Sequence, residues 1–431
     1  MSTTPGTGSL PLRKKSNNRT HQADDKIDLP RNTLLRSAIV KRISRSIALL
    51  AVVSATALTV GACSSGTDTA DEVWRIGLEA PLTGSQAALG QGMLQGAQLA
   101  ADNVNSTGGL MGRQIEIIAI DDAADPATGV AAANKAISEG INGVVGPYNS
   151  SVGLQTLPLY EDAGLVPIRL TSDNATEGMG ITLQPMTSQI APVTSEALSK
   201  FYGAKKVAVL YDPTEEYTTS AAAAVKKELE SAGVTITSYS EVQPGQDQAT
   251  YTSAIKAAEA TKPDAIYSAV YYPEGAMIAK AVSETESAPG AKSCLLDYSS
   301  YDNGYVQNAG VKVAQACDVV GVPAPSDFPN SAQFVDAFQA KFNAAPGTWS
   351  PYTYDSVKVL TDSVAKVGKW DSQEIQSALS SVSGWTGWTG SVTIEPSTGN
   401  RVPATVVVTQ VADDGSFTVA PQWAAGSTAK N

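Results

Sequence analysis

Two consecutive serines stand where a helix is predicted to begin. Ser150 and Ser151 follow the turn Gly146-Pro147-Tyr148-Asn149 and precede a stretch whose apolar residues recur at helical spacing. The free backbone N–H groups, the hydroxyls and the positive end of the helix dipole at such a position can bind a carboxylate without any basic side chain. Serine also caps helices that bind nothing, so the position alone leaves both interpretations open.

A second polar segment follows another predicted strand. Thr171, Ser172 and Asp173 come after the strand Leu165–Arg169, at the carboxyl end of the strand, where open α/β sheets place their ligands. Their side chains could help the serines to bind one solute that carries both a carboxylate and an ammonium group. A plain turn rich in Ser, Asp and Asn would have the same sequence.

Two side chains later in the chain could bind a positively charged group. Tyr271 and Asp297 each follow a predicted strand. Asp297 could accept a charge-assisted hydrogen bond from an ammonium group, and a tyrosine ring could cover an alkyl group or a cation. Surface acids and half-buried tyrosines are common, so a purely structural role is the alternative.

Several kinds of chemistry are excluded by what the sequence lacks. The single histidine, His21, lies in an N-terminal segment that we expect to be removed, so histidine bases, Ser-His pairs and histidine metal ligands are excluded. The chain has no phosphate-binding lysine loop, no cluster of metal ligands and no cysteine beside a basic partner. We therefore predict no enzyme activity, no metal and no cofactor; a hydrolase that uses carboxylates is the remaining enzymatic alternative.

The first 62 residues have the pattern of an export signal. A polar, basic stretch ends in the apolar run Ile47–Val60, which is too short to span a bilayer but suits a signal peptide. Val60-Gly61-Ala62-Cys63 resembles the lipobox of bacterial lipoproteins, in which the cysteine sulfur takes a lipid. We predict that residues 1–62 are removed, that Cys63 is lipidated and that residues 63–72 form a flexible tether. An uncleaved membrane anchor is the alternative.

Removal of this segment makes the rest of the chain strongly acidic. Residues 1–62 contain 10 Lys and Arg and 3 Asp and Glu, which leaves 20 basic and 39 acidic residues and a formal net charge of −19. Such a surface repels phosphate backbones, so the sequence predicts no binding of nucleic acid.

Two cysteines remain, Cys294 and Cys317. An even number of cysteines in an exported protein favours a disulfide, which would stabilise the fold by roughly 3 kcal/mol on the chain-entropy model. Two separate buried thiols are the alternative.

The order of predicted elements indicates an α/β protein with two domains. Strand and helix alternate from Val73 to Gly146 and again from Pro192 to Val322, and this alternation predicts two parallel sheets flanked by helices. The segment from Gly390 to Val419 reads instead as antiparallel hairpins.

The ordered succession of motifs resembles the branched-chain amino-acid binding proteins of ABC importers, over roughly residues 73–420. The motifs that carry this resemblance are Ile76-Gly77-Leu78, Ala80-Pro81-Leu82-Thr83-Gly84, Gly108-Gly109-Leu110-Met111-Gly112-Arg113, Asp121-Asp122, Asp125-Pro126, Ala131-Ala132-Ala133-Asn134-Lys135, Val144-Val145-Gly146-Pro147, Tyr160-Glu161-Asp162-Ala163-Gly164 and Tyr271-Tyr272-Pro273-Glu274.

The resemblance implies a two-lobed type I periplasmic-binding fold with three crossings between the lobes. Lobe 1 would comprise residues 73–190 and 323–385, and lobe 2 would comprise residues 191–322 and 386–425. The solute would bind in the cleft between the lobes, which close over it.

The resemblance also implies roles for individual residues. Ser150 falls on a serine that binds the solute's α-carboxylate, and Asp297 falls on the acid that binds its α-ammonium. The remaining ligand positions implied in this way are Ser151, Thr171, Ser172, Asp173, Tyr217, Tyr271 and Leu89. This sequence departs from the family pattern at three of the positions: Asp297 is shorter than the usual glutamate, Asp173 replaces a threonine, and Asn149 replaces a cysteine found in some members.

These observations predict an extracytoplasmic lipoprotein that is anchored to the cell membrane and delivers an amino-acid-like solute to ABC permease subunits. The alternative is a sensor of the same fold that presents its closed state to a membrane receptor. Leucine-like amino acids, other amino acids, amides and aromatic acids all remain open as the solute.

Overall fold

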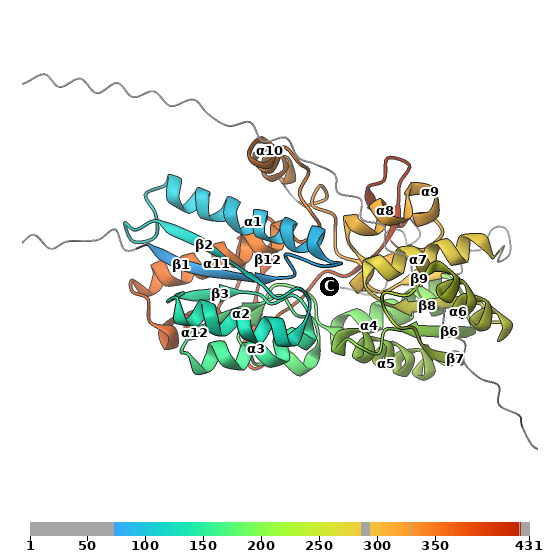
Figure 1. The fold of residues 1–431 in the computed structure, drawn as a ribbon. Coiled ribbons are helices and arrows are strands. Elements are labelled where there is room, and N and C mark those ends of the chain that lie inside the picture. Colours follow the sequence, from blue (N-terminus) through green and yellow to red (C-terminus); the bar gives the residue numbers. More distant parts are fainter. Residues whose placement is uncertain (1–72, 286–293, 329, 422, 424–431) are drawn as a thin grey trace, which may run out of the picture. The chain divides into compact units, whose positions relative to one another are not determined.

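The computed structural model describes residues 73–285, 294–328, 330–421 and 423 (Figure 1). Cys63, the predicted signal segment and the predicted tether lie outside the described residues. All described residues belong to one compact unit, 66–431. Within the described ranges, no helix is both long enough and apolar enough to cross a membrane.

The first lobe is built on a five-stranded parallel sheet with the strand order β2-β1-β3-β4-β5. From Ile76 to Ala80 the central strand is buried without interruption, as expected for a parallel strand covered on both faces. The strands are β1 (Trp74–Ala80), β2 (Ile115–Asp121), β3 (Gly143–Val145), β4 (Pro167–Arg169) and β5 (Ile181–Thr182).

Two helix ends of the first lobe lie where the sequence predicts them, at Asp125-Pro126 and after Val367. Asp125 caps α2 by accepting a hydrogen bond from the Thr128 N–H at 2.7 Å, and Pro126 occupies the first helical position. The helix α11 ends at Gly368, whose φ of 80° suits glycine. The helices of this lobe are α1 (Ala87–Ser106), α2 (Pro126–Ser138), α3 (Ser150–Asp162), α10 (Ser331–Phe342), α11 (Ser350–Val367) and α12 (Ser372–Ser380).

The second lobe is built on a seven-stranded mixed sheet with the order β16-β15-β10-β9-β8-β6-β7. Its first five strands along the chain are parallel, whereas β15 runs antiparallel to both β10 and β16. The strands are β6 (Lys206–Tyr211), β7 (Thr235–Glu241), β8 (Ala265–Ala269), β9 (Cys294–Leu296), β10 (Asp318–Gly321), β15 (Val407–Val411) and β16 (Phe417–Val419). The helices are α4 (Thr187–Glu196), α5 (Glu216–Ser231), α6 (Gln248–Ala260), α7 (Tyr272–Glu284), α8 (Asn303–Ala309) and α9 (Val311–Ala314).

Two helices of this lobe start earlier than their sequence predicts. We expect a helix after Pro192, but α4 begins at Thr187 because Gln189 caps its first turn by accepting a hydrogen bond from the Met186 N–H at 2.9 Å. A π-helical turn, Ala197–Phe201, then continues α4. The Ala-, Lys- and Glu-rich stretch Thr219–Ala232 predicts a helix, and α5 begins three residues earlier, at Glu216.

The chain crosses between the lobes three times, between β5 and α4, between β10 and α10, and between β14 and β15. The predicted two-lobed α/β fold with three crossings is therefore confirmed.

The tail differs from the expectation that residues 386–425 lie wholly in the second lobe. The hairpin of β13 (Ile394–Glu395) and β14 (Asn400–Arg401) lies against β5 of the first lobe, where the Thr182 N–H donates to the Gly399 carbonyl at 2.8 Å. A second small hairpin pairs β11 (Trp385–Gly387) with β12 (Gly390–Val392). Because β5 is an edge strand, its free backbone groups find partners in the tail hairpin, and the tail joins the second sheet only from Val407.

Candidate solute-binding site

A small cavity lies between the two lobes, at the ends of the strands where the sequence predicts ligands. Six of its seven lining residues carry a hydroxyl group, and none of the residues that line it is charged. The first lobe contributes Tyr148, Ser150, Leu170 and Ser172, and the second contributes Tyr217, Tyr271 and Tyr298. Of two larger hollows, one beside Arg401 contains none of the predicted site residues and the other contains only Ser151. We place the site at the smaller cavity because four of the predicted residues line it.

Ser150 is the first residue of α3, as predicted, and only 1% of it is exposed. Its Oγ accepts a hydrogen bond from the Asp173 backbone N–H at 3.3 Å, so its own hydroxyl hydrogen can still donate. The free N–H groups of the first helical turn lie beside it. This arrangement can bind a carboxylate.

Ser151 does not line the cavity. Its hydroxyl donates a short hydrogen bond to the Glu215 carboxylate of the second lobe, and it accepts one from the Glu216 N–H at 3.2 Å. Burial raises the pKa of Glu215 to about 7, while the Ser151 hydroxyl acts in the opposite direction. Ser151 therefore joins the lobes directly.

The three residues of the predicted loop, Thr171, Ser172 and Asp173, make three different kinds of contact. Only Ser172 lines the cavity. Thr171 is buried beneath it, where its hydroxyl and that of Thr176 lie 2.7 Å apart. The Asp173 carboxylate caps a short 3₁₀ turn, Asn174–Thr176, and accepts a short hydrogen bond from the Ser220 hydroxyl of the second lobe.

Two tyrosines of the second lobe that the sequence singles out line the cavity. Tyr217 lies in the first turn of α5, and Tyr271 immediately precedes α7. The Tyr271 ring lies 6.3 Å from the ring of Tyr148 across the cleft. The Tyr217 hydroxyl is buried, and the described residues supply it with no hydrogen-bond partner.

Asp297 lies behind the cavity wall and is fully buried. Its carboxylate accepts hydrogen bonds from the Tyr267 hydroxyl at 2.7 Å, the Ser299 N–H at 3.1 Å and the Ser299 hydroxyl at 3.2 Å. Burial raises the pKa of Asp297, and these hydrogen bonds partly offset that effect. Asp297 does not line the cavity itself, but it lies beside Tyr217 and the backbone of Tyr298, which do.

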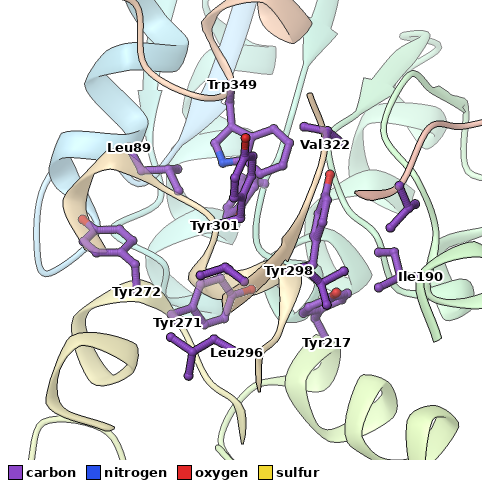
Figure 2. Close-up of a cluster of buried hydrophobic side chains, with 14 of the residues drawn as sticks. Leu89, Ile190, Tyr217, Tyr271, Tyr272, Leu296, Tyr298, Tyr301, Val322 and Trp349 are labelled. Atoms are coloured by element: carbon purple, nitrogen blue, oxygen red, sulfur yellow. The ribbon is translucent and has the colours of Figure 1, made fainter. Parts of the chain in front are cut away.

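Leu89 is buried in α1 and does not line the cavity. Figure 2 shows it beside Tyr272. The Tyr272 hydroxyl donates to the Ser85 carbonyl of the first lobe at 2.9 Å, so this contact joins the lobes near the cavity.

Three lining residues are absent from the predicted site: Tyr148, Leu170 and Tyr298. Leu170 and Tyr298 are directly adjacent to the predicted residues Thr171 and Asp297, and Tyr148 lies two residues before Ser150, so a search two residues to either side of the predicted positions would find them. Trp349 is the fourth residue that the sequence does not single out. Its ring packs 5.1 Å from Tyr298 (Figure 2) and 5.8 Å from Tyr148, yet it comes from a distant segment whose only signal is a tryptophan before a helix.

The described residues contain no group of three or more His, Cys, Asp or Glu that could hold a metal ion. The chemistry that the site offers is therefore hydrogen bonding and aromatic contact. It can bind and orient a small polar molecule.

Known proteins resemble this chain along most of its described length. The family described as periplasmic binding protein matches residues 73–416. The Leu/Ile/Val-binding protein BraC3 of Rhizobium johnstonii is 30% identical over 311 residues, which cover 70% of this chain and 82% of that protein. The crystal structure of the leucine-binding protein LivK from Thermotoga maritima has a TM-score of 0.73 and 21% identity, and covers 81% of this chain and 98% of its own.

A second solved structure has the same fold but is described with a different solute. A solute-binding protein from R. palustris, in complex with 4-hydroxybenzoate, has a TM-score of 0.71 and 19% identity, and covers 81% of this chain and 96% of its own. The fold alone therefore does not fix the solute.

Proposed function

The chain belongs to the periplasmic binding protein family, and from this premise we propose that it captures an amino-acid-like solute for the permease subunits of an ABC importer. Members of this family bind solutes outside the cytoplasm and are not enzymes. The observation that carries the proposal is the cavity between the lobes, to which both lobes contribute side chains. A solute that contacts both lobes stabilises the closed arrangement, and the importer recognises that arrangement.

The two ends of the solute are bound by different lobes in this proposal. The Ser150 hydroxyl and the N-terminal N–H groups of α3 bind the α-carboxylate. The α-ammonium lies near Tyr217, where the buried Asp297 carboxylate compensates its charge. Tyr271 and Tyr148 close the remaining walls. Both charged groups of the solute need such partners, because a buried unpaired charge costs more free energy than apolar contacts return.

Isothermal titration calorimetry tests this proposal. A panel of amino acids, amides and aromatic acids is titrated into the mature protein, and we expect one amino acid to bind with one-to-one stoichiometry and to be recovered unaltered. Ser150→Ala should weaken the binding of that amino acid. The absence of binding by every amino acid would overturn the amino-acid assignment.

We also propose that Cys63 carries a lipid that anchors the protein to the membrane. The support is the sequence Val60-Gly61-Ala62-Cys63 after an apolar signal segment. Incorporation of a labelled fatty acid should be lost in Cys63→Ala and kept in Ser64→Ala. Continued labelling of the Cys63 variant would refute the anchor.

The disulfide is proposed on the geometry of its two cysteines. The Cα atoms of Cys294 and Cys317 lie 4.7 Å apart, within the range of disulfides, and both side chains are fully buried. We expect no free thiol when the unreduced mature protein lacking Cys63 is titrated under denaturing conditions. Two free thiols would show that the pair is reduced.

A further inference from the structure

We propose that the solute carries a neutral hydrogen-bonding group, an amide or a hydroxyl, in its side chain, and that the Tyr298 hydroxyl selects for it. This inference rests on the proposed function, because it concerns the part of the amino acid that the carboxylate and ammonium partners leave free. It narrows the solute from amino acids in general to those with short polar side chains.

The cavity wall is the first observation. A pocket for an aliphatic side chain is lined by aliphatic and aromatic carbon, with few polar atoms. Here Leu170 is the single aliphatic residue of the lining, and every other lining side chain ends in a hydroxyl. A solute with an aliphatic side chain would bury those hydroxyl groups without offering them a hydrogen-bond partner.

The second observation is that two of these hydroxyls make no hydrogen bond of good geometry within the described residues. Tyr217 and Tyr298 are 3% and 2% exposed, and the polar groups nearest their hydroxyls are the Asp297 carboxylate and the Ser172 hydroxyl, respectively. A buried polar group that stays unpaired costs free energy, and a solute that pairs it removes that cost. Tyr217 lies next to the buried Asp297 and so belongs to the ammonium end of the site, which leaves Tyr298 for the side chain.

The surroundings hold the Tyr298 ring in place. Trp349 packs on it at 5.1 Å, and Tyr217 lies 6.4 Å from it on another side (Figure 2). Ser172, across the cavity, is 6% exposed and its hydroxyl lies 3.5 Å from Gln184 Oε1, at the limit of a hydrogen bond. The hydroxyls of Tyr298 and Ser172 can therefore both turn to a polar group of the solute.

The charges around the cavity favour a neutral group over an ionised one. The lining contains no Lys, Arg, Asp or Glu. Burial raises the pKa of Tyr148, Tyr217 and Tyr271, and the nearby acids Asp297, Asp302, Glu215 and Asp212 raise it further. A carboxylate side chain would meet these acids without a cationic partner. A cationic side chain would compete with the α-ammonium for Asp297.

Matched pairs of amino acids test the proposal. Leucine and asparagine, valine and threonine, and norleucine and glutamine are nearly equal in size and differ in polarity. We expect the polar member of the best-binding pair to bind about tenfold or more tightly by calorimetry, because sites with buried hydrogen-bonding groups reject analogues that lack the partner. Equal or tighter binding of the aliphatic member, or binding only of amino acids outside these pairs, overturns this inference and leaves the proposed function standing. No binding by any amino acid overturns the proposed function.

Two variants that remove a single hydroxyl locate the selecting group. Tyr298→Phe keeps the ring and should abolish the preference for the polar amino acid. The affinity for the polar member of the pair should fall about tenfold, and the affinity for the aliphatic member should stay the same or rise. Tyr301→Phe is the matched control, since its hydroxyl is also buried without a described partner but does not line the cavity. Circular dichroism confirms that both variants fold. A preference that survives in Tyr298→Phe, or is lost in Tyr301→Phe, overturns the role of Tyr298.

Discussion

Two sets of side chains come from the same elements but face different partners. The cavity set consists of Ser150, Ser172 and Tyr217, which line the space between the lobes. The clasp consists of two hydrogen-bonded pairs that join the lobes directly, Ser151 with Glu215 and Ser220 with Asp173. Consecutive residues of a helix point about 100° apart, so Ser150 and Ser151 cannot face the same partner.

The two sets also differ in how completely their hydrogen bonds are made. Each clasp hydroxyl donates to a carboxylate of the opposite lobe, so the clasp favours contact between the lobes without help from a solute. In the cavity set, the Tyr217 hydroxyl has no partner within the described residues, and Ser150 Oγ accepts a hydrogen bond while its hydrogen remains available. The cavity set thus depends on the solute, and mutations in the two sets should affect binding in different ways.

The largest expected effect is in the cavity region and comes from the acid behind it. Asp297→Ala should weaken binding of the amino acid by about 3 kcal/mol, because it removes a charged partner of the ammonium group in a buried site. Asp297→Asn is the control, since it keeps the shape of the side chain and removes only the charge. Calorimetry measures both affinities, and thermal unfolding checks that loss of the Tyr267 hydrogen bond has not unfolded the second lobe. Wild-type affinity in Asp297→Ala would remove this residue from the site.

The sequence predicts the fold well because the fold depends on patterns that repeat along the chain. Apolar strands, Asp125-Pro126 at a helix start and Gly108-Gly109 after a helix each report on their own neighbourhood. The early start of α4 at Thr187 escapes prediction because Gln189 caps it from inside the helix. The placement of the tail hairpin against β5 depends on which edge strand is free, and no local pattern contains that information.

The sequence predicts which strand ends lie at the cavity, but not which side chains face it. The strand ends that the sequence selects do line the cavity, through Ser150, Ser172, Tyr217 and Tyr271. Ser151 and Asp173 differ from their predicted role because the direction of a side chain on a turn or a helix end depends on backbone angles that strand-end position does not fix. Trp349 escapes because it reaches the site by packing from a distant segment.

The second largest effect concerns the clasp and depends on pH. Glu215 is buried between Ser151, Asp212, Asp122 and Tyr271, and burial raises its pKa from 4.5 to about 7. When the lobes separate and the carboxyl group meets water, its pKa returns toward the ordinary value. Closure then takes up a proton between about pH 4.5 and 7. The contribution of Glu215 to closure is therefore fully present below about pH 4.5 and is lost as the pH rises through 7.

We expect wild-type affinity to fall between pH 5 and pH 8, by at most about 2 kcal/mol from this group. Glu215→Gln mimics the protonated carboxyl group and should remove this part of the pH dependence while affinity stays near its low-pH value. Titration of Asp297 affects both proteins equally, so the difference between their affinities at each pH isolates Glu215. Parallel pH profiles for the two proteins would show that the clasp does not take up a proton on closure.

Ser150→Ala separates the cavity set from the clasp within one helix turn. It should weaken solute binding by about 1 to 2 kcal/mol, because a hydrogen bond to the solute's carboxylate is lost. Both Ser150 and Ser151 lie in the first turn of α3, so Ser151→Ala controls for changes in helix capping. Ser150→Ala should also shift selectivity against solutes that retain the carboxylate, when they are compared with their amides. An unchanged ratio between acid and amide would place the carboxylate elsewhere.

The smallest expected effect is the loss of the second clasp pair. Ser220→Ala removes the donor to Asp173 and should weaken affinity by about 1 kcal/mol, because one hydrogen bond of this carboxylate is lost while the one from the Ala175 N–H remains. The loss should appear as faster dissociation in stopped-flow measurements, with the association rate unchanged, since the pair forms only after the lobes meet. Asp173→Asn in the Ser220→Ala background should add little, because the interaction is already absent. If the double variant loses much more affinity than Ser220→Ala alone, Asp173 contacts the solute itself, and the distinction between the two sets fails at that residue.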